Sequence, residues 1–218
     1  MKKVDIILPT FNCEKYIEET LNSIINQSVK YWRLIIVDDS SQDNTVQIIN
    51  KFLKDDRINL IKLKKNKGAG FCRNLAIRAS NSKYVAFIDS DDIWKSEKLN
   101  KQINQMDNKN LDFTYTDYTP FKEKNGVKKM MKTITLPKSF NYISFIKKTS
   151  ICTSSMIIKR TNIKLVKFLK TKICEDYYFK CQLLKNCNYA INIEENLTLY
   201  RLSPNSLQSQ KMRNFYWV

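Results

Sequence analysis

The first 90 residues alternate apolar runs typical of buried strands with segments of helical spacing, and this alternation constrains the fold more than any other feature. The strand-like runs are residues 4–8, 32–37, 58–63 and 84–88. The helix-like segments are 14–27, where Asn12 is expected to be the N-cap, then 45–53 and 69–80. Strands and helices that alternate in this way form parallel pairs through right-handed crossovers. The sequence therefore predicts an α/β fold: a Rossmann-like, mostly parallel sheet with helices on both faces.

The pattern is looser after residue 110. Further strands are expected at 111–118, 151–158, 188–193 and 197–201, and further helices at 95–106, 140–148, 160–170 and 177–185. Residues 121–138 have the composition of a basic, turn-like stretch. Because no Pro/Gly-rich linker interrupts the chain, we expect its two halves to form one domain.

Composition excludes several kinds of chemistry. The 218 residues include no histidine, which rules out Ser-His and Cys-His nucleophiles and histidine-containing zinc sites. Six cysteines without a Cys-x-x-Cys pair are expected to be reduced thiols. A general base must then be Asp or Glu, with Lys or Tyr as lesser alternatives.

The net charge of +17 is unevenly distributed. Residues 1–110 hold 19 basic and 14 acidic side chains, and residues 111–218 hold 19 and 7. Such a charge attracts anionic lipid, nucleic acid or a phosphorylated substrate, and composition does not choose among them. No apolar run approaches the roughly 20 residues that span a bilayer. We therefore expect a cytoplasmic protein with possible peripheral contact with the anionic inner membrane face.

Acidic side chains follow two of the expected strands. Asp38 and Asp39 come after the second strand, and Asp89, Asp91 and Asp92 after the fourth. Like charges this close repel each other unless a cation shares them, and ligands bind at the carboxyl ends of parallel strands. The pattern favours a divalent metal site that holds a phosphate-bearing substrate. A solvated acidic turn that caps the next helix is the alternative.

Four stretches together resemble the nucleotide-sugar transferases of glycosyltransferase family 2, which have the GT-A fold. They are Ile-Leu-Pro-Thr-Phe-Asn at 7–12, Ile-Val-Asp-Asp-Ser-Ser at 36–41, Asn66 and Gly68 with Arg73, and Phe-Ile-Asp-Ser-Asp-Asp-x-Trp at 87–94. A later Glu-Asp pair at 175–176 also fits. The resemblance is close over residues 3 to 104 and sparse afterwards. It implies that residues 1–110 bind the nucleotide sugar and 111–218 the acceptor, within one GT-A domain.

On the donor side, the resemblance implies a role for each matching residue. Pro9 would lie at the edge of the nucleotide, and Asp39 would accept a hydrogen bond from the base, which is uracil in many members. Arg73 would lie near the base and ribose. Asp89 would sit beside the ribose and the metal, and Asp91 would ligate Mn²⁺ or Mg²⁺ on the diphosphate.

On the acceptor side, Asp176 would be the catalytic base with Glu175 beside it, while Asp92 and Trp94 would face the acceptor. The implied reaction is an inverting, metal-dependent transfer from a UDP-sugar to a hydroxyl of a surface glycan, such as lipopolysaccharide or capsule, or of a lipid-linked acceptor. The alternatives are a nucleotidyltransferase, for which a Gly-rich phosphate loop is missing, and a basic nucleic-acid-binding protein. We expect no nucleic-acid partner, because the ligand edge is acidic.

The sequence departs from the family at two points. Ser40 stands where members often carry Gly, and no histidine follows Tyr200 and Arg201. If that histidine contacts metal or diphosphate in other members, Arg201 or Ser206 is the candidate substitute. The chain ends in an apolar cluster at 215–218, from which we expect a further tail that would complete the acceptor site or dock on a membrane.

Overall fold

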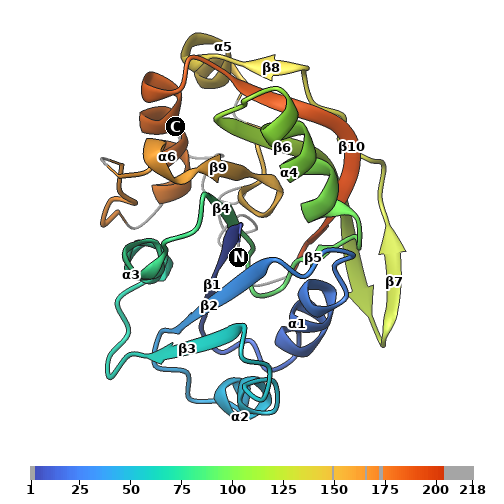
Figure 1. Ribbon diagram of the computed structural model, residues 1–218. Coiled ribbons are helices and arrows are strands. Elements are labelled where there is room, and N and C mark those ends of the chain that lie inside the picture. Colours follow the sequence, from blue (N-terminus) through green and yellow to red (C-terminus); the bar gives the residue numbers. More distant parts are fainter. Residues whose placement is uncertain (1–2, 149, 165, 172–173, 204–218) are drawn as a thin grey trace, which may run out of the picture.

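The computed structural model describes residues 3–148, 150–164, 166–171 and 174–203. Within this part of the chain, one mixed sheet has the strand order β3-β2-β1-β4-β9-β6-β10-β5, and helices cover both of its faces (Figure 1). The predicted α/β class is confirmed.

The first four strands are parallel and confirm the predicted alternation. They are β1 (Val4–Thr10), β2 (Trp32–Asp38), β3 (Ile58–Lys62) and β4 (Tyr84–Phe87). The connecting helices are α1 (Ile17–Ile25), α2 (Thr45–Asn50) and α3 (Ala69–Ala79). Every residue of β1 and β4 is buried, as expected for strands covered on both faces.

The second half extends the same sheet. It contributes β6 (Phe113–Lys124), β7 (Val127–Met130), β8 (Ser139–Phe140), β9 (Ile157–Lys159) and β10 (Ala190–Arg201), and β5 (Ile93–Trp94) pairs with β10. Its helices are α4 (Lys98–Asn108), α5 (Tyr142–Lys147) and α6 (Glu175–Asn186). The short strand β9 runs antiparallel to both β4 and β6 and so joins the two halves.

An apolar core lies on each face of the sheet, between the strands and the helices that cover them. On one face, Leu21 of α1, Ile49 of α2 and Ile103 of α4 pack with Ile6 and Ile36 of the central strands. The other face packs α3, α5 and α6 against alternate strand residues, through Ala76, Phe145, Phe179, Ile7 and Ile35. Because successive strand residues point to opposite faces, one run of apolar residues supplies both cores.

Several predicted elements of the second half are wrong. The stretch 121–138 is not a turn, because Phe121 is buried within β6, which continues to Lys124 and forms a hairpin with β7. Residues 160–170 form no α-helix in the described part, only the short 3₁₀ turn Arg160–Asn162. Residues 151–158 hold a second 3₁₀ turn, Thr153–Ser155, before β9 begins.

Two further differences have local causes. The strands expected at 188–193 and 197–201 form the single strand β10, which stays paired with β6 across irregularities near Asn196. Asn12 is not an N-cap, because it has a φ of 45° and its side-chain oxygen accepts a hydrogen bond from the Gln42 amide at 2.8 Å. None of the described helices is both long and apolar enough to cross a membrane.

The buried carboxylate of Asp5 fixes the amino end of β1. It accepts hydrogen bonds from Arg33 at 2.8 and 3.1 Å, and from the amides of Asn81 and Ser82 at 2.7 and 2.8 Å. Burial alone would raise the pKa of Asp5, but these hydrogen bonds outweigh it and lower the pKa below its usual value. The interaction holds the turn between α3 and β4 in place.

We predict that Asp5→Asn lowers the free energy of unfolding by about 3 kcal/mol at neutral pH, since it leaves Arg33 without its charged partner. A lowered folded-state pKa means that this stabilisation is complete above the unfolded-state pKa and is lost as pH falls. The difference from the parent protein, measured by urea denaturation, should therefore shrink below about pH 4. Asp56→Asn, at an exposed carboxylate, is the control. An effect of equal size at every pH would contradict the prediction.

Candidate active site

Strands β1, β2 and β4 end at the same edge of the sheet, and their polar residues meet there. Pro9 is buried in β1 beside Val37 of β2. Asp38 accepts hydrogen bonds from the Thr10 hydroxyl at 3.0 Å and from the Ser41 hydroxyl at 2.6 Å. Its carboxylate therefore fixes the end of β2.

Asp39 joins this edge to the start of α3. Its two carboxylate oxygens accept hydrogen bonds from the amides of Lys67 and Gly68, each at 2.7 Å. Gly68 has φ 89° and ψ 155°, a conformation that is essentially restricted to glycine. The structure therefore explains why glycine stands here, and it places α3 directly against Asp39.

Arg73 connects three elements. Its guanidinium donates to Asp89, after β4, at 2.6 Å, and contacts Glu175, at the start of α6, at 3.5 Å. Burial alone would lower the pKa of Arg73, but the neighbouring carboxylates outweigh it and raise the pKa. Arg73 therefore carries a permanent positive charge between the two acidic motifs of the sequence.

Asp91 lies in the same loop as Asp89, and its carboxyl group titrates well above its usual pKa. Burial, followed by the charge of Asp89, raises the pKa of Asp91 to about 6. Asp89 keeps an exposed side-chain fraction of 32% beside its contact with Arg73. The two carboxylates thus form an acidic pair at the carboxyl edge of the sheet.

Asp92 and Trp94 lie inside the protein. Asp92 accepts hydrogen bonds from the Ser154 hydroxyl and the Arg201 amide, and it has no exposed surface. Burial and the charge of Asp91 raise the pKa of Asp92 well above its usual range. The Trp94 indole donates to the Ser154 carbonyl at 2.7 Å. Both side chains are buried, so this geometry does not support the expected contact of Asp92 and Trp94 with an acceptor.

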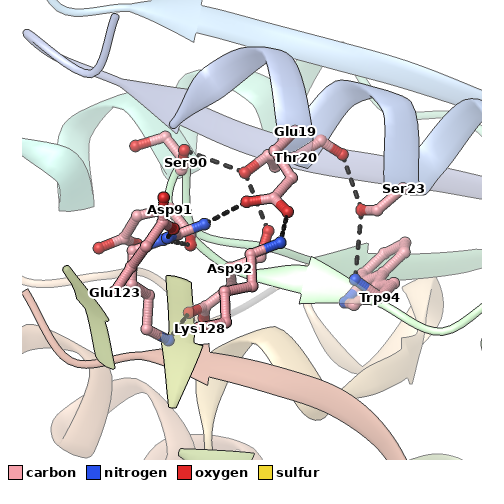
Figure 2. A network of polar contacts seen from close by, with 10 residues as sticks. Glu19, Thr20, Ser23, Ser90, Asp91, Asp92, Trp94, Glu123 and Lys128 are labelled. Carbon is pink, nitrogen blue, oxygen red and sulfur yellow. Dashed lines mark hydrogen bonds and ion pairs between the residues drawn. The ribbon is translucent and has the colours of Figure 1, made fainter. Parts of the chain in front are cut away.

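Arg201 holds the same loop from the other side. Its Nε donates to the Asp91 carbonyl at 2.8 Å, and its two terminal nitrogens form ion pairs with Glu19 and Glu123. These glutamates, with Lys128, surround the loop (Figure 2). The guanidinium is 1% exposed and fully engaged, so it does not substitute for a missing histidine at a metal or diphosphate. Ser206, the other candidate, lies outside the described residues.

Asp176 begins α6 beside Glu175. Its Oδ2 accepts a hydrogen bond from Lys180 Nζ at 3.0 Å, and this ammonium also donates to the Ile151 carbonyl at 2.8 Å. The Asp176 side chain is 36% exposed, whereas that of Lys180 is 4% exposed. A buried cation thus holds a carboxylate that solvent can reach. Sequence reasoning missed Lys180, although its spacing of four residues from Asp176 within a helix is a detectable signal.

The donor set suits a hard cation. Among the described residues, no group of three or more His, Cys, Asp or Glu side chains is arranged to hold a metal ion. Mg²⁺ typically uses only one or two protein carboxylates, with substrate phosphates and water completing its shell. Asp89 and Asp91 therefore fit such an ion if the substrate carries phosphate groups.

A mostly parallel sheet with acids at its carboxyl edge and a Glu-Asp pair opposite defines this chain as a GT-A-type enzyme of the glycosyltransferase class. Residues 5–174 match the model of glycosyl transferase family 2, and the chain belongs to this family. This membership decides between the two enzyme hypotheses in favour of glycosyltransferase.

Named relatives are similar over nearly the whole chain. TuaG of Bacillus subtilis (strain 168), a glycosyltransferase named for teichuronic acid biosynthesis, is 36% identical over 96% of this chain and 83% of its own. WfaP of Escherichia coli is 35% identical over 98% of this chain and 82% of its own. WfaP is named a UDP-Glc:alpha-D-GlcNAc-diphosphoundecaprenol beta-1,3-glucosyltransferase.

Solved structures confirm the GT-A fold. TarS of S. aureus, residues 1-349, in complex with UDP superposes with a TM-score of 0.78 at 26% identity. The match covers 93% of this chain and 61% of the TarS chain. The complex of TarS with UDP-GlcNAc gives a TM-score of 0.80 at 25% identity, over 95% of this chain and 60% of TarS. The chain therefore spans about 60% of the length of these solved chains.

We predict that Asp91→Asn stabilises the cation-free protein at neutral pH. A raised folded-state pKa means that ionisation of Asp91 costs stability as pH rises through about 6. The variant should be more stable than the parent by about 2 kcal/mol at pH 7, and by little at pH 4. Mn²⁺ should raise the melting temperature of the parent at pH 7 and leave the variant unchanged. A variant that is less stable at pH 7, or that still responds to Mn²⁺, would contradict this assignment.

Proposed function

We propose that this enzyme is an inverting, divalent-metal-dependent glycosyltransferase that moves a sugar from a UDP-sugar to a hydroxyl of a surface glycan or a lipid-linked acceptor. One observation carries the proposal: Arg73 touches both Asp89 and Glu175, which lie 86 residues apart in the chain. It thereby places the donor-side loop next to the helix that carries the candidate base.

The donor side would be built by the edge of the parallel strands. Pro9 and Asp39 would border the base, and Arg73 and Asp89 would border the ribose. The UDP and UDP-GlcNAc complexes of TarS and the donor in the name of WfaP support uridine as the base. Since Asp39 already accepts two backbone hydrogen bonds, its carboxylate is held in one orientation for a further donor group on the base.

Asp91, with Asp89, would hold Mn²⁺ or Mg²⁺ on the diphosphate. When bound, the cation would supply charge neutralisation for the departing nucleoside diphosphate. A cation would also relieve the repulsion between the two carboxylates, which is part of the reason that the pKa of Asp91 is raised. The residues present therefore match the need of the reaction.

Asp176 would take the proton from the acceptor hydroxyl. Lys180 is a positioning residue in this scheme: it ties the Asp176 carboxylate to the backbone at Ile151 and leaves part of it open to solvent. With a single base on the acceptor side, the hydroxyl attacks the sugar from the face opposite the diphosphate. One displacement of this kind inverts the anomeric carbon.

The acceptor would be a bacterial surface polysaccharide precursor. TuaG is named for teichuronic acid biosynthesis and WfaP for a diphosphoundecaprenol-linked sugar. A lipid-linked acceptor would bring the enzyme to a membrane surface, and the basic second half is suited to anionic lipid. Peripheral attachment to the cytoplasmic face of the membrane is therefore part of the proposal.

We predict that Asp176→Asn lowers the rate of sugar transfer by roughly 10² to 10⁴, since general base catalysis is typically of this size. Binding of the UDP-sugar, measured by calorimetry with Mn²⁺, should stay unchanged, because Asp176 would act on the acceptor hydroxyl in this scheme. Asp91→Asn should instead abolish cation-dependent donor binding. Asp56→Asn, on the exposed surface, is the control for both. Transfer by Asp176→Asn at the parental rate would remove the base from the proposal.

We predict that Gly68→Ala weakens donor binding as well as stability. An added Cβ would meet nothing within 4 Å, so the cost comes from the backbone conformation and should be about 1 to 3 kcal/mol. Gly126, with φ 76° in the β6–β7 turn, is a matched control, because its Cβ would also be free of contacts. Gly126→Ala should lose stability and keep its affinity for the UDP-sugar. Equal donor affinities for the two variants would contradict the role of the Asp39 contact.

A further inference from the structure

A cavity with a volume of about 210 Å³ lies between the last turns of α3 and residues 160–164, 166 and 167. Arg78, Arg160, Lys164 and Lys167 line it together with apolar and neutral polar residues, and no acidic side chain is among the lining residues. Four basic residues therefore line one small space.

These cations have no ion-pair partner in the part of the chain that the structure describes. The arginines make the contrast clear. Of the six arginines in the described residues, four form ion pairs: Arg33, Arg57, Arg73 and Arg201. The other two, Arg78 and Arg160, both line this cavity. Their charges remain available to an external anion.

The walls of the cavity are held in place. Asn74 and Phe168 exchange two hydrogen bonds, of 2.8 and 3.0 Å, which fix the segment to α3. Arg160 donates from Nε to the Ser82 carbonyl at 3.0 Å, and its terminal nitrogens form no hydrogen bond or ion pair with the residues that the structure describes. Ile163 and Val166 are 1% and 3% exposed and belong to the core. A preformed site of this kind loses little entropy when a ligand binds.

A simpler role for Arg78 is compensation of the partial negative charge at the end of α3. That role explains one cation at the last turn of the helix. It does not explain Arg160, Lys164 and Lys167, which come from a different segment and converge on the same space. An anion bound in the cavity would compensate the positive charges of all four residues.

We propose that this cavity binds the phosphate group of an anionic ligand. Paired arginines match phosphate oxygens through their fixed forks of donors, and lysines add point charges. The cavity is smaller than the roughly 300 Å³ at which small-molecule sites usually begin, so it suits a headgroup rather than a whole nucleotide sugar. Gly68 and Arg78 are at opposite ends of α3, about 15 Å apart along the helix axis. The cavity is thus separate from the Asp39 turn.

The phosphate could come from a soluble compound or from a lipid headgroup, and two binding measurements separate these sources. Calorimetry with inorganic phosphate measures the soluble form. Sedimentation with phosphatidylcholine vesicles, with and without phosphatidic acid, measures the lipid form. The parent protein is compared with Arg78→Gln/Arg160→Gln and with the control Lys51→Gln/Lys54→Gln, which removes two exposed charges on the other side of the sheet.

The arginine variant should bind phosphate at least about tenfold more weakly than the parent, since each lost charged hydrogen bond is worth about that factor. The control should bind like the parent. If the arginine variant also loses binding to phosphatidic acid vesicles that the parent shows, the ligand is a lipid headgroup; phosphate binding without vesicle binding identifies a soluble phosphate. Arg78→Gln alone, at an exposed side chain, tests the same point if the double variant folds poorly. Equal phosphate affinity in the parent, the arginine variants and the control, or no phosphate binding by the parent, would overturn the proposal.

Discussion

Three carboxylates lie within four residues after β4, and one of them, that of Asp92, is fully buried; the rest of this structure depends on this constraint. Like charges in a poorly solvated loop repel each other, and each of the three carboxylates has a different environment. Asp89 is paired with Arg73, and Asp92 is buried on Ser154 and the Arg201 amide. For Asp91, burial and the charge of Asp89 outweigh the favourable contacts and raise the pKa to about 6. The loop therefore disfavours the ionised form of Asp91 as well as that of Asp92, and a cation bound beside Asp91 would relieve part of this cost.

The groups that hold the loop come from distant parts of the chain, and this explains why the two halves share one sheet. Arg73 reaches Asp89 from α3, Arg201 reaches the loop from the end of β10, and Ser154 lies just before β9. β9 is inserted between β4 and β6, so Ser154 stands directly beside the loop. The second half thus completes the candidate donor site as well as supplying Asp176. The contacts of the 89–92 loop therefore cross the expected border at residue 110.

The sequence predicts the first half of the fold well because its signals are local. Each of the first four strands is rich in apolar residues, helices connect them in turn, and β1, β2 and β3 pair in that order. The second half could not be predicted in this way, because β6, β9 and β10 take their partners from far along the chain. Buried polar residues such as Thr114 and Thr116 break the apolar pattern of β6, and the irregular pairing near Asn196 hides the continuity of β10. The acids of the site follow strand ends and are visible in sequence, whereas Ser154 and Arg201 are recognised only through partners 62 and 109 residues away.

The net charge of +17 helps to locate an anion site only when the basic residues that form ion pairs are distinguished from those that do not. At the candidate active site the arginines are bound to carboxylates, so the positive charge there organises the protein and does not by itself attract a ligand. At the cavity beside α3 the arginines have no carboxylate partner among the described residues, and the same residue type is available to recognise an anion. A fold can therefore use one kind of side chain in two ways, and the difference is set by whether a carboxylate lies within reach. For a basic protein such as this one, the location of the unpaired arginines is a better guide to an additional anion site than the total charge.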